Sequence, residues 1–410
     1  MPLGDVLQGL VTLTLVVICA ALAKELCRRC NQPTVLGPIV FGLVVGTAVA
    51  AGWHPAQLAL SGASKFLVDA AGTGGLLLLM FSVGLELRSH RAPGQRSTGR
   101  QLISAVAFPI VVCAAAACPF AHQLTGSKGN PLSAWIFVGV ALGVTAVPVL
   151  VLVIADLGIS SSPVAQTAMR ISVLTDGFAW AMMTLLLIVS TNIGAASLGE
   201  LGVGAVLMAV VVAVLPRMFH RISIFQQNTA RAITMFAYAL TGAAGTQLLG
   251  LHPALGAVIA GYFFPAALTS PDAKRVLAMV IDMLIPAFFV VTALSIPLQT
   301  LRGQFGWRGV LCLLTLTVAA FASKILAGYA CGRMAGYSSA ASGQLGVLLN
   351  CRGVTEIAIA SVGYQAHLVD AYAFALLCAL AILTTAVTAP LFRAVNRVGR
   401  VRDRTRGRTP

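Results

Sequence analysis

The sequence predicts an all-α polytopic membrane protein, and three observations point to that fold class. Of the 410 residues, 58% are hydrophobic and only 10% are charged, and the mean hydropathy is +0.91. A soluble domain contains about 25% charged residues. Runs of about 18 or more apolar residues, the length of a transmembrane helix, recur along nearly the whole chain. This composition excludes an ordinary soluble protein and favours many membrane spans over several globular domains.

Thirteen candidate transmembrane helices follow from the places where Gly, Pro and charged clusters interrupt the apolar runs. In chain order, the expected ranges are 6–24, 34–52, 65–87, 101–122, 133–155, 164–190, 199–219, 230–249, 251–267, 275–297, 308–332, 340–365 and 369–394. The boundary between the eighth and ninth ranges, in LLGLHPALG, is the weakest of these divisions.

The first apolar run, VLQGLVTLTLVVICAALA, also resembles a secretory signal peptide because it ends in small residues. A signal peptide carries its positive charge before the apolar run. Here Asp5 precedes the run, whereas Lys24, Arg28 and Arg29 follow it. We therefore interpret the run as a retained first helix.

The basic residues in the connections predict the orientation of the helices. With the N-terminus outside, 20 Lys and Arg residues lie on the cytoplasmic side and only Lys65, Lys128, Arg302 and Arg308 on the outer side. Cytoplasmic loops of membrane proteins carry an excess of Lys and Arg. We therefore expect a multi-pass protein of the cell membrane with the N-terminus outside and the C-terminus in the cytoplasm.

The net charge of +15 does not indicate nucleic-acid binding, because the basic residues lie in short connections. We expect a transmembrane domain over 1–394 and a short basic cytoplasmic tail over 395–410, with the segment RAVNRVGRVRDRTRGRTP disordered and no soluble domain after it. Such a tail would fix the topology or touch anionic lipid, or alternatively regulate the protein. Nine scattered cysteines with a lone CRRC do not predict a zinc site, and we expect no cofactor.

Among the ionisable residues inside the expected spans, five are singled out after the basic residues of the connections are assigned: Asp176, Asp282, Lys324, Arg352 and Glu356. Such residues usually face a bundle interior or a water-filled cavity, where they pair or carry ions. Asp176 and Lys324 are the deepest. One interpretation is a structural salt bridge between their helices. The other interpretation is functional. Desolvation raises the pKa of a buried carboxylate and a nearby cation lowers it, and the balance of the two allows the carboxylate to exchange a proton for a metal ion.

Two spans carry residues that interrupt a helix. The fifth contains Thr145 and Pro148, and the twelfth contains Asn350, Arg352 and Gly353. Proline removes a hydrogen bond from the helix, and irregular backbone in a membrane persists where protein or a water-lined cavity satisfies it. A single proline can be a harmless kink. Two interrupted spans in corresponding places indicate a transporter site.

Four segments together resemble the monovalent cation:proton antiporter family 2, and especially the plant cation/proton exchangers and the bacterial potassium-efflux antiporters. These segments are FSVGLELR, GVTAVPVLVLVIADLGISSSPVAQTAMRISVLTDGFAW, FFVVTAL and LLNCRGVTEIAIASVG. The resemblance covers almost the whole chain, in the same order. It implies a sodium/proton-antiporter fold with two inverted repeats, in which two discontinuous helices cross near the ion site, and it implies a homodimer.

The same resemblance assigns residues to the site. It places Asp176 at the ion-binding aspartate, Lys324 at the core lysine, and Arg352 in the motif N-x-R-G. One departure is clear: the residue before the aspartate is commonly Asn, Gln or Asp, and here it is Thr175. A hydroxyl can bind a cation but cannot carry a second proton, which argues against an exchange that uses two carboxylates.

We therefore expect an antiporter in which Asp176 binds either a proton or a monovalent cation, K+ or Na+, by alternating access and with electroneutral exchange. Lys324 would neutralise Asp176 in the empty state, and Thr145 and Thr175 would offer oxygen ligands. Structural support would come from Pro148, Asn350, Arg352 and Glu356. The alternatives are an antiporter-like scaffold that serves as a membrane-embedded enzyme on a lipophilic substrate, and a gated channel.

Overall fold

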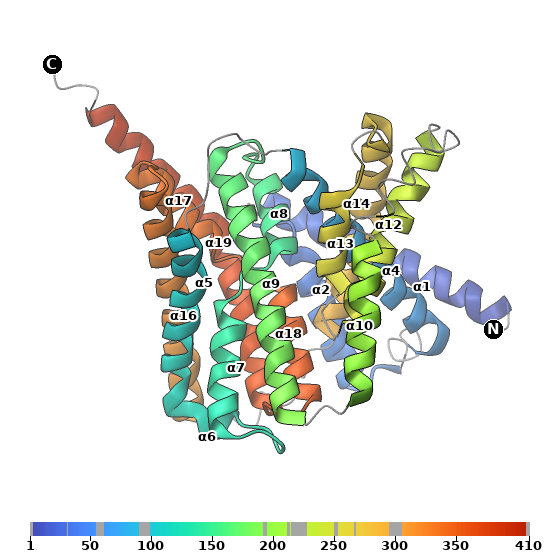
Figure 1. Cartoon of the computed structure of the whole chain (residues 1–410), viewed down its shortest axis with the longest axis horizontal. Helices are drawn as coiled ribbons and strands as arrows, with labels where there is room; N and C mark the ends of the chain where they lie inside the picture. Colours follow the sequence, from blue (N-terminus) through green and yellow to red (C-terminus); the bar gives the residue numbers. More distant parts are fainter. Residues whose placement is uncertain are drawn as a thin grey trace. The chain divides into compact units, whose positions relative to one another are not determined.

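The computed structural model describes residues 3–30, 32–54, 61–89, 99–191, 195–210, 214, 228–249, 253–265, 268–294 and 306–406. These residues form mostly helices (Figure 1). The described part of the chain contains no β-strand, although an isolated antiparallel bridge joins Thr125 to Val369. The all-α class predicted from the sequence is confirmed.

The helices and their bounds, in chain order, are α1 (Leu3–Arg29), α2 (Leu36–Ala50), α4 (Gly62–Ser89), α5 (Gly99–Ala117), the 3₁₀-helix η1 (Cys118–Phe120), α6 (Ala121–Leu124), α7 (Pro131–Gly143), α8 (Val147–Asp156), α9 (Pro163–Thr191), α10 (Ala195–Ala209), α12 (Asn228–Leu248), α13 (Pro253–Phe263), α14 (Pro271–Leu294), α16 (Trp307–Met334), α17 (Ser339–Leu348), α18 (Val354–Gln365) and α19 (Ala371–Arg406).

A helix or a pair of helices lies in each of the thirteen expected ranges. The fifth range contains α7 and α8, and the twelfth contains α17 and α18. Seven helical segments of the described chain are long and apolar enough to cross a membrane by length and composition: 4–29, 62–86, 104–124, 131–156, 271–294, 307–334 and 371–397. The chain is thus a multi-pass membrane protein, while the number of thirteen spans stays a prediction.

The last helix differs from the expectation. The basic composition from Arg393 onward predicts disorder, whereas α19 continues as one helix to Arg406. The apolar part of α19 provides a nucleus, and adding residues to an existing helix is far easier than starting one. Arg has a good helix propensity, so the basic segment continues the helix that precedes it.

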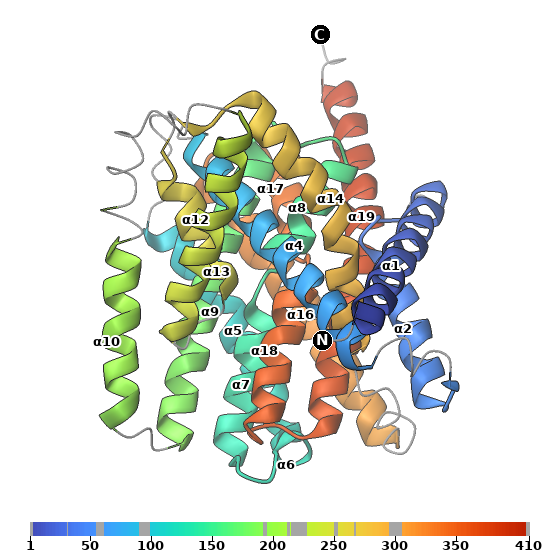
Figure 2. The same cartoon turned by 90° about the vertical axis from the view of Figure 1, so that its right-hand side faces the viewer.

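The chain divides into two compact units. The first comprises residues 1–23, 38–92 and 188–294. In it, α13 packs against α4 and α12, and α4 also packs against α14 (Figures 1 and 2). A Cβ atom on Gly256 would overlap the carbonyl oxygen of Gly242, so α12 and α13 approach backbone to backbone. Small residues at such crossings permit close packing in membranes.

The second unit comprises residues 24–37, 93–187 and 295–410. In it, α5 packs against α7 and α16, α16 packs against α17, and α19 packs against α17 and α18. This unit contains both interrupted helices. It also contains every residue that the sequence assigns to the site: Asp176, Lys324, Thr145, Thr175, Pro148, Asn350, Arg352 and Glu356.

Candidate functional site

The fifth expected span is broken where the sequence predicts it. Helix α7 ends at Gly143, and extended backbone follows at Val144 (φ −80°, ψ 155°) and Ala146 (φ −70°, ψ 105°). Helix α8 begins at Val147, with Pro148 as its second residue. Proline is tolerated in the first turn of a helix, because the N–H group that it lacks has no partner there. Pro148 therefore starts α8 and does not merely kink a continuous helix.

The twelfth expected span is broken in the same way. Helix α17 ends at Leu348, and α18 begins after Gly353, which has φ 146° and ψ −116°. Only glycine adopts this backbone conformation readily. Asn350 and Arg352 lie in the interruption between the two helices, and both are fully buried. Gly353 allows the chain to turn back into a helix at this point.

The two breaks are bonded to each other. The Ala146 N–H donates a hydrogen bond to the Cys351 carbonyl oxygen at 2.9 Å, and the Thr145 hydroxyl donates one to the Leu349 carbonyl oxygen at 2.7 Å. Backbone groups that lose their helical partners are expensive in a membrane unless protein or water satisfies them. Each break therefore supplies partners to the other, as expected for two crossing discontinuous helices.

Asp176 lies on α9 with 6% of its surface exposed. Its Oδ2 accepts long hydrogen bonds from the Val147 N–H at 3.5 Å and from the Thr355 hydroxyl at 3.4 Å. Val147 is the first residue of α8 and Thr355 lies in the first turn of α18. The N-terminus of a helix carries partial positive charge, which stabilises an anion. The other oxygen, Oδ1, is buried without a hydrogen-bond partner in the described structure.

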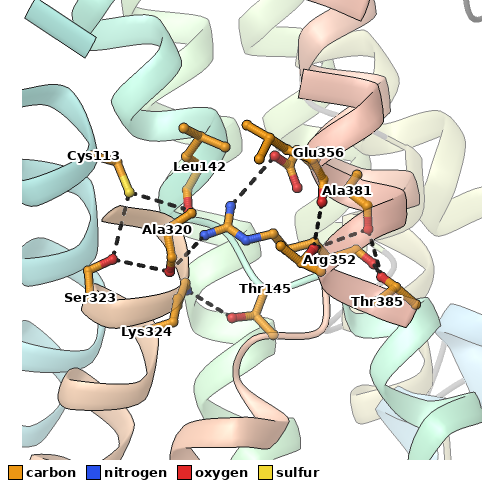
Figure 3. Close-up of polar contacts among 12 residues, drawn as sticks. Cys113, Leu142, Thr145, Ala320, Ser323, Lys324, Arg352, Glu356, Ala381 and Thr385 are labelled. Carbon is orange, nitrogen blue, oxygen red and sulfur yellow. Dashed lines mark hydrogen bonds and ion pairs between the residues drawn. The ribbon is translucent and has the colours of Figure 1, made fainter. Parts of the chain in front are cut away.

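Lys324 reaches the break from α16. It is 1% exposed, and its Nζ donates a hydrogen bond to the Thr145 hydroxyl at 2.8 Å (Figure 3). The described contacts of Lys324 and Asp176 include no ion pair between the two side chains. The direct salt bridge that the structural interpretation requires is therefore not formed. Lys324 instead places its charge on the extended segment between α7 and α8.

Arg352 and Glu356 form a buried pair on the other break. The Arg352 Nη1 lies 3.5 Å from the Glu356 Oε1, and the two side chains are 0% and 1% exposed. The Arg352 Nη2 donates to the Ala320 carbonyl oxygen on α16 at 3.4 Å, and the Arg352 carbonyl accepts from the Thr385 hydroxyl on α19 at 2.5 Å (Figure 3). Arg352 thus ties the break to α16 and α19.

Two of the predicted site residues, Thr175 and Asn350, make no hydrogen bond to Asp176 among the described contacts. The Thr175 hydroxyl donates to the Ser172 carbonyl oxygen on its own helix at 2.8 Å. The Asn350 side chain is fully buried, and neither its Oδ1 nor its Nδ2 has a hydrogen-bond partner among the described residues. Buried polar groups of this kind are usually satisfied by water or an ion when protein offers no partner. Asn350 therefore adds two unsatisfied polar atoms to the region of the break.

Other participants were missed by the sequence reasoning. The Thr355 hydroxyl and the Val147 N–H both contact Asp176. The Cys113 thiol, from α5, lies 3.7 Å from the Ser323 hydroxyl and 4.0 Å from the Leu142 carbonyl oxygen (Figure 3). A hydroxyl residue two positions after Gly353 was an available signal for Thr355. Asp282, which lies inside the tenth expected span, is exposed on α14 in the first unit.

Comparisons with known proteins support a common origin over nearly the whole chain. A family model described as "Sodium/hydrogen exchanger, transmembrane" matches residues 13–394. The chain is 26% identical over 404 residues to the Na+/H+ antiporter NhaS4 of Synechocystis sp., which covers 95% of this chain and 98% of that protein. It is 25% identical over 397 residues to the Na+/H+-K+ antiporter GerN of Bacillus cereus, with 93% and 94% covered.

Plant relatives and a solved structure extend the comparison. Cation/H+ antiporter 20 of Arabidopsis thaliana is 26% identical over 415 residues, which are 95% of this chain and 49% of that protein. This chain thus spans about half the length of the Arabidopsis relatives. The sodium proton antiporter MjNhaP1 from Methanocaldococcus jannaschii matches with a TM-score of 0.62 at 15% identity over 94% of this chain and 96% of that one, a likeness of fold. With the family model matched from residue 13 to residue 394, the chain belongs to the transmembrane sodium/hydrogen exchanger family.

Proposed function

We propose that the chain is a secondary antiporter that exchanges protons for a monovalent cation, K+ or Na+, with Asp176 as the shared site. The observation that carries this proposal is the environment of the Asp176 carboxylate. It is buried, one oxygen faces the N-terminus of α8, and the other oxygen has no hydrogen-bond partner among the described residues. The family match and the antiporter names of the relatives support the same function.

The chemistry of the exchange follows from what Asp176 can bind. A carboxylate oxygen binds either a proton or a hard cation, and the two compete for the same lone pairs. The Val147 N–H and the Thr355 hydroxyl hold Oδ2, which leaves Oδ1 for the exchanged ion. Alternating access requires that this site faces the two sides of the membrane in turn.

The nearby oxygens can complete the coordination of the cation. The Thr145 hydroxyl donates to Leu349 and accepts from Lys324, so one of its two lone pairs remains. Thr175 donates to Ser172 and keeps both of its own. Lys324 neutralises the negative charge of Asp176 when the site is empty. Because Thr175 carries no proton of its own to exchange, one proton for one cation is the proposed, electroneutral stoichiometry.

We also propose a cellular setting for this antiporter. It is a multi-pass protein of the cell membrane with the N-terminus outside and the C-terminus in the cytoplasm, and with a transmembrane domain over 1–394 followed by a basic tail over 395–410. It works as a homodimer in contact with membrane lipid. The excess of Lys and Arg in alternate connections supports the orientation.

The proposal is tested with the purified chain in proteoliposomes that contain a pH-sensitive dye. A jump in external K+ or Na+ should move protons in wild-type vesicles, and Asp176→Asn should abolish that movement because an amide cannot exchange a proton. Asp272→Asn is the matched control: Asp272 is an exposed acid on α14, 3.7 Å from Arg275, and its replacement should leave transport unchanged. Undiminished proton flux in Asp176→Asn would refute the assignment.

The same assay distinguishes the other functions. An electroneutral exchanger should give the same proton flux when a potassium ionophore clamps the membrane potential at different values, whereas a gated channel would follow the potential. The enzyme alternative has no support in the relatives named above, each of which carries an antiporter name. A wild-type chain that moves no protons with either cation would overturn the proposed function.

A further inference from the structure

The far end of α8 makes a specific contact that the proposed ion exchange does not use. Asp156, the last residue of α8, accepts a hydrogen bond at its Oδ2 from the Thr34 N–H at 2.7 Å. The Thr34 hydroxyl lies 2.9 Å from the Asp156 Oδ1 and 2.8 Å from its Oδ2. Hydrogen bonds to a charged carboxylate at such distances are among the stronger ones in proteins.

The local structure of α8 does not explain this aspartate. An acidic residue at the C-terminus of a helix meets the negative end of the helix dipole, which disfavours it. Asp156 is also exposed, so it fills no position in the core. Its partner Thr34 lies two residues before α2 begins at Leu36. A negative charge is favourable at this N-terminal end of α2, because it meets the positive end of the helix dipole. The contact with Thr34 is therefore the reason for a carboxylate at this position.

The opposite end of α8 carries the group that holds the ion site. Its first residue, Val147, donates its N–H to the Asp176 Oδ2. The helix has 10 residues, and at 1.5 Å per residue its two ends lie about 14 Å apart. A short helix transmits a displacement at one end to the other, because its hydrogen-bonded backbone resists bending. Fixing Asp156 therefore helps to fix the Val147 N–H.

The segment 24–37, which contains Thr34, connects two stretches of the chain that belong to the other unit. The connection 24–37 belongs to the second unit, while the chain before it, 1–23, and after it, 38–92, belongs to the first. Thr34 and Asp156 both lie in the second unit. The bond between them thus attaches the α1–α2 connection to the helix that carries part of the site.

We propose that Asp156 is a positioning residue: by fixing the C-terminal end of α8 to Thr34, it holds the Val147 N–H against the carboxylate of Asp176. This inference rests on the proposed function of Asp176. Loss of the Thr34 contact frees α8 to shift, which weakens a donor that favours the ionised carboxylate over the protonated one. The cation then binds less tightly and the proton competes better.

The test compares Asp156→Ala with Asp156→Asn in proteoliposomes. Asp156→Ala removes the contact, and outer partners of a metal site typically change metal affinity by 10-fold or more, so the apparent KM for the cation should rise about tenfold. The pH profile of transport should move toward alkaline pH, with a smaller change in kcat. Asp156→Asn keeps an oxygen for the Thr34 N–H and an amide for its hydroxyl, and should stay close to wild type. The comparison of Asp156→Ala with Asp156→Asn therefore separates the effect of the hydrogen-bonded contact from the effect of the negative charge.

Thr34 provides the reciprocal experiment. Thr34→Val removes the hydroxyl and should raise the KM in the same direction, whereas Thr34→Ser keeps the hydroxyl and should not. Because the two residues act through one contact, the double variant Asp156→Ala with Thr34→Val should be no worse than Asp156→Ala alone. Cation-dependent thermal stabilisation in detergent, measured on the same variants, reports binding without transport.

Three outcomes would overturn the inference. The first is a KM and pH profile unchanged in both Asp156→Ala and Thr34→Val, even if less protein folds, because a purely structural role lowers only the amount of active protein. The second is an equal shift in Asp156→Asn and Asp156→Ala, which would indicate charge and not position. The third is a wild-type chain that neither binds nor transports a cation, which overturns the proposed function as well, whereas the first two leave that function standing.

Discussion

At the scale of single residues, the second unit keeps charge inside the membrane in two different ways. Asp176 has long hydrogen bonds to one oxygen and none to the other among the described residues, an arrangement suited to a group that exchanges its ligand. Arg352 and Glu356 instead face each other at 3.5 Å with almost no exposure. A buried pair contributes little net stability over apolar residues, but removing one partner leaves a buried charge that nothing compensates.

We therefore expect Arg352→Met to lower the free energy of unfolding by about 3–5 kcal/mol, because Glu356 is left as an unpaired buried charge. The double variant Arg352→Met with Glu356→Leu should recover much of that loss. Thermal melting of the detergent-solubilised variants measures both effects. A double variant as unstable as the sum of the two single variants would show that the side chains do not act as a pair.

The exposed pair on α1 is the control for this experiment. The Arg28 Nη2 lies 2.7 Å from the Glu25 Oε2, closer than in the buried pair, but the two side chains are 71% and 38% exposed. Water screens such pairs, so they contribute little. Arg28→Met should leave the melting temperature almost unchanged despite the shorter distance.

How much of the site the sequence predicts depends on which chemical groups compose it. Asp176 and Lys324 are conspicuous because a charge inside an apolar run is rare, and Pro148 and Gly353 mark the breaks. The Val147 N–H, the Leu349 carbonyl and the Cys351 carbonyl take part as backbone groups, and their residue types say nothing of that role. Asp156 was not found because its partner is 122 positions away in the chain.

At the scale of elements, each discontinuous helix is really two short helices whose inner ends meet the partner break. In the apolar stretch that α7 and α8 share, 83% of the residues are buried, whereas in the apolar stretch of α1 only 22% are buried. The length of the apolar run predicts a single span of 133–155, because hydropathy averages over a three-residue interruption. The polar residues, Pro148 and Gly353 within the two runs reveal the interruptions. The exact ends need the hydrogen bonds between the breaks, which no local pattern contains.

The start of α18 depends on the backbone of Gly353. A Cβ atom there would lie 2.8 Å from the Val149 Cγ2, and φ 146° is strained for any L side chain. We expect Gly353→Ala to destabilise the protein by about 1–3 kcal/mol, the cost of a residue held in a sparsely populated backbone region. Thermal melting measures this loss, and the added variant Val149→Ala should restore only part of it, since removing the contact leaves the backbone strain.

Gly199→Ala is the matched control in α10. Gly199 has open space around its Cα and no positive φ, so alanine should be neutral or slightly stabilising, as expected in a helix interior. Equal destabilisation by Gly199→Ala and Gly353→Ala would contradict the role assigned to the backbone of Gly353. Complete rescue of Gly353→Ala by Val149→Ala would assign the effect to the contact alone.

At the scale of the whole molecule, contacts between connections agree with the proposed topology. Thr34 and Asp156 lie at ends assigned to the cytoplasm, and they are hydrogen-bonded. The Thr167 hydroxyl and the Tyr337 Oη, also assigned inside, lie 2.8 Å apart. On the opposite side, the Asp370 N–H donates to the Leu124 carbonyl at 3.2 Å, and the Tyr372 Oη donates to the Gly309 carbonyl at 3.1 Å. One span more or fewer between such partners would place them on opposite sides.

These contacts fix which ends share a side, and the native cysteines can show which side is outside. Cys30 and Cys118 are both exposed; the proposed orientation places Cys30, after α1, in the cytoplasm and Cys118 near the outer end of the fourth expected span. A membrane-impermeant maleimide should therefore label Cys118 in intact cells and Cys30 only after permeabilisation. Cys30→Ser and Cys118→Ser assign each signal, and the buried cysteines should react slowly in both conditions because a folded core excludes the reagent. Labelling of Cys30 from outside would reverse the orientation while leaving the pairing of ends intact, because the hydrogen bonds specify only which ends lie together.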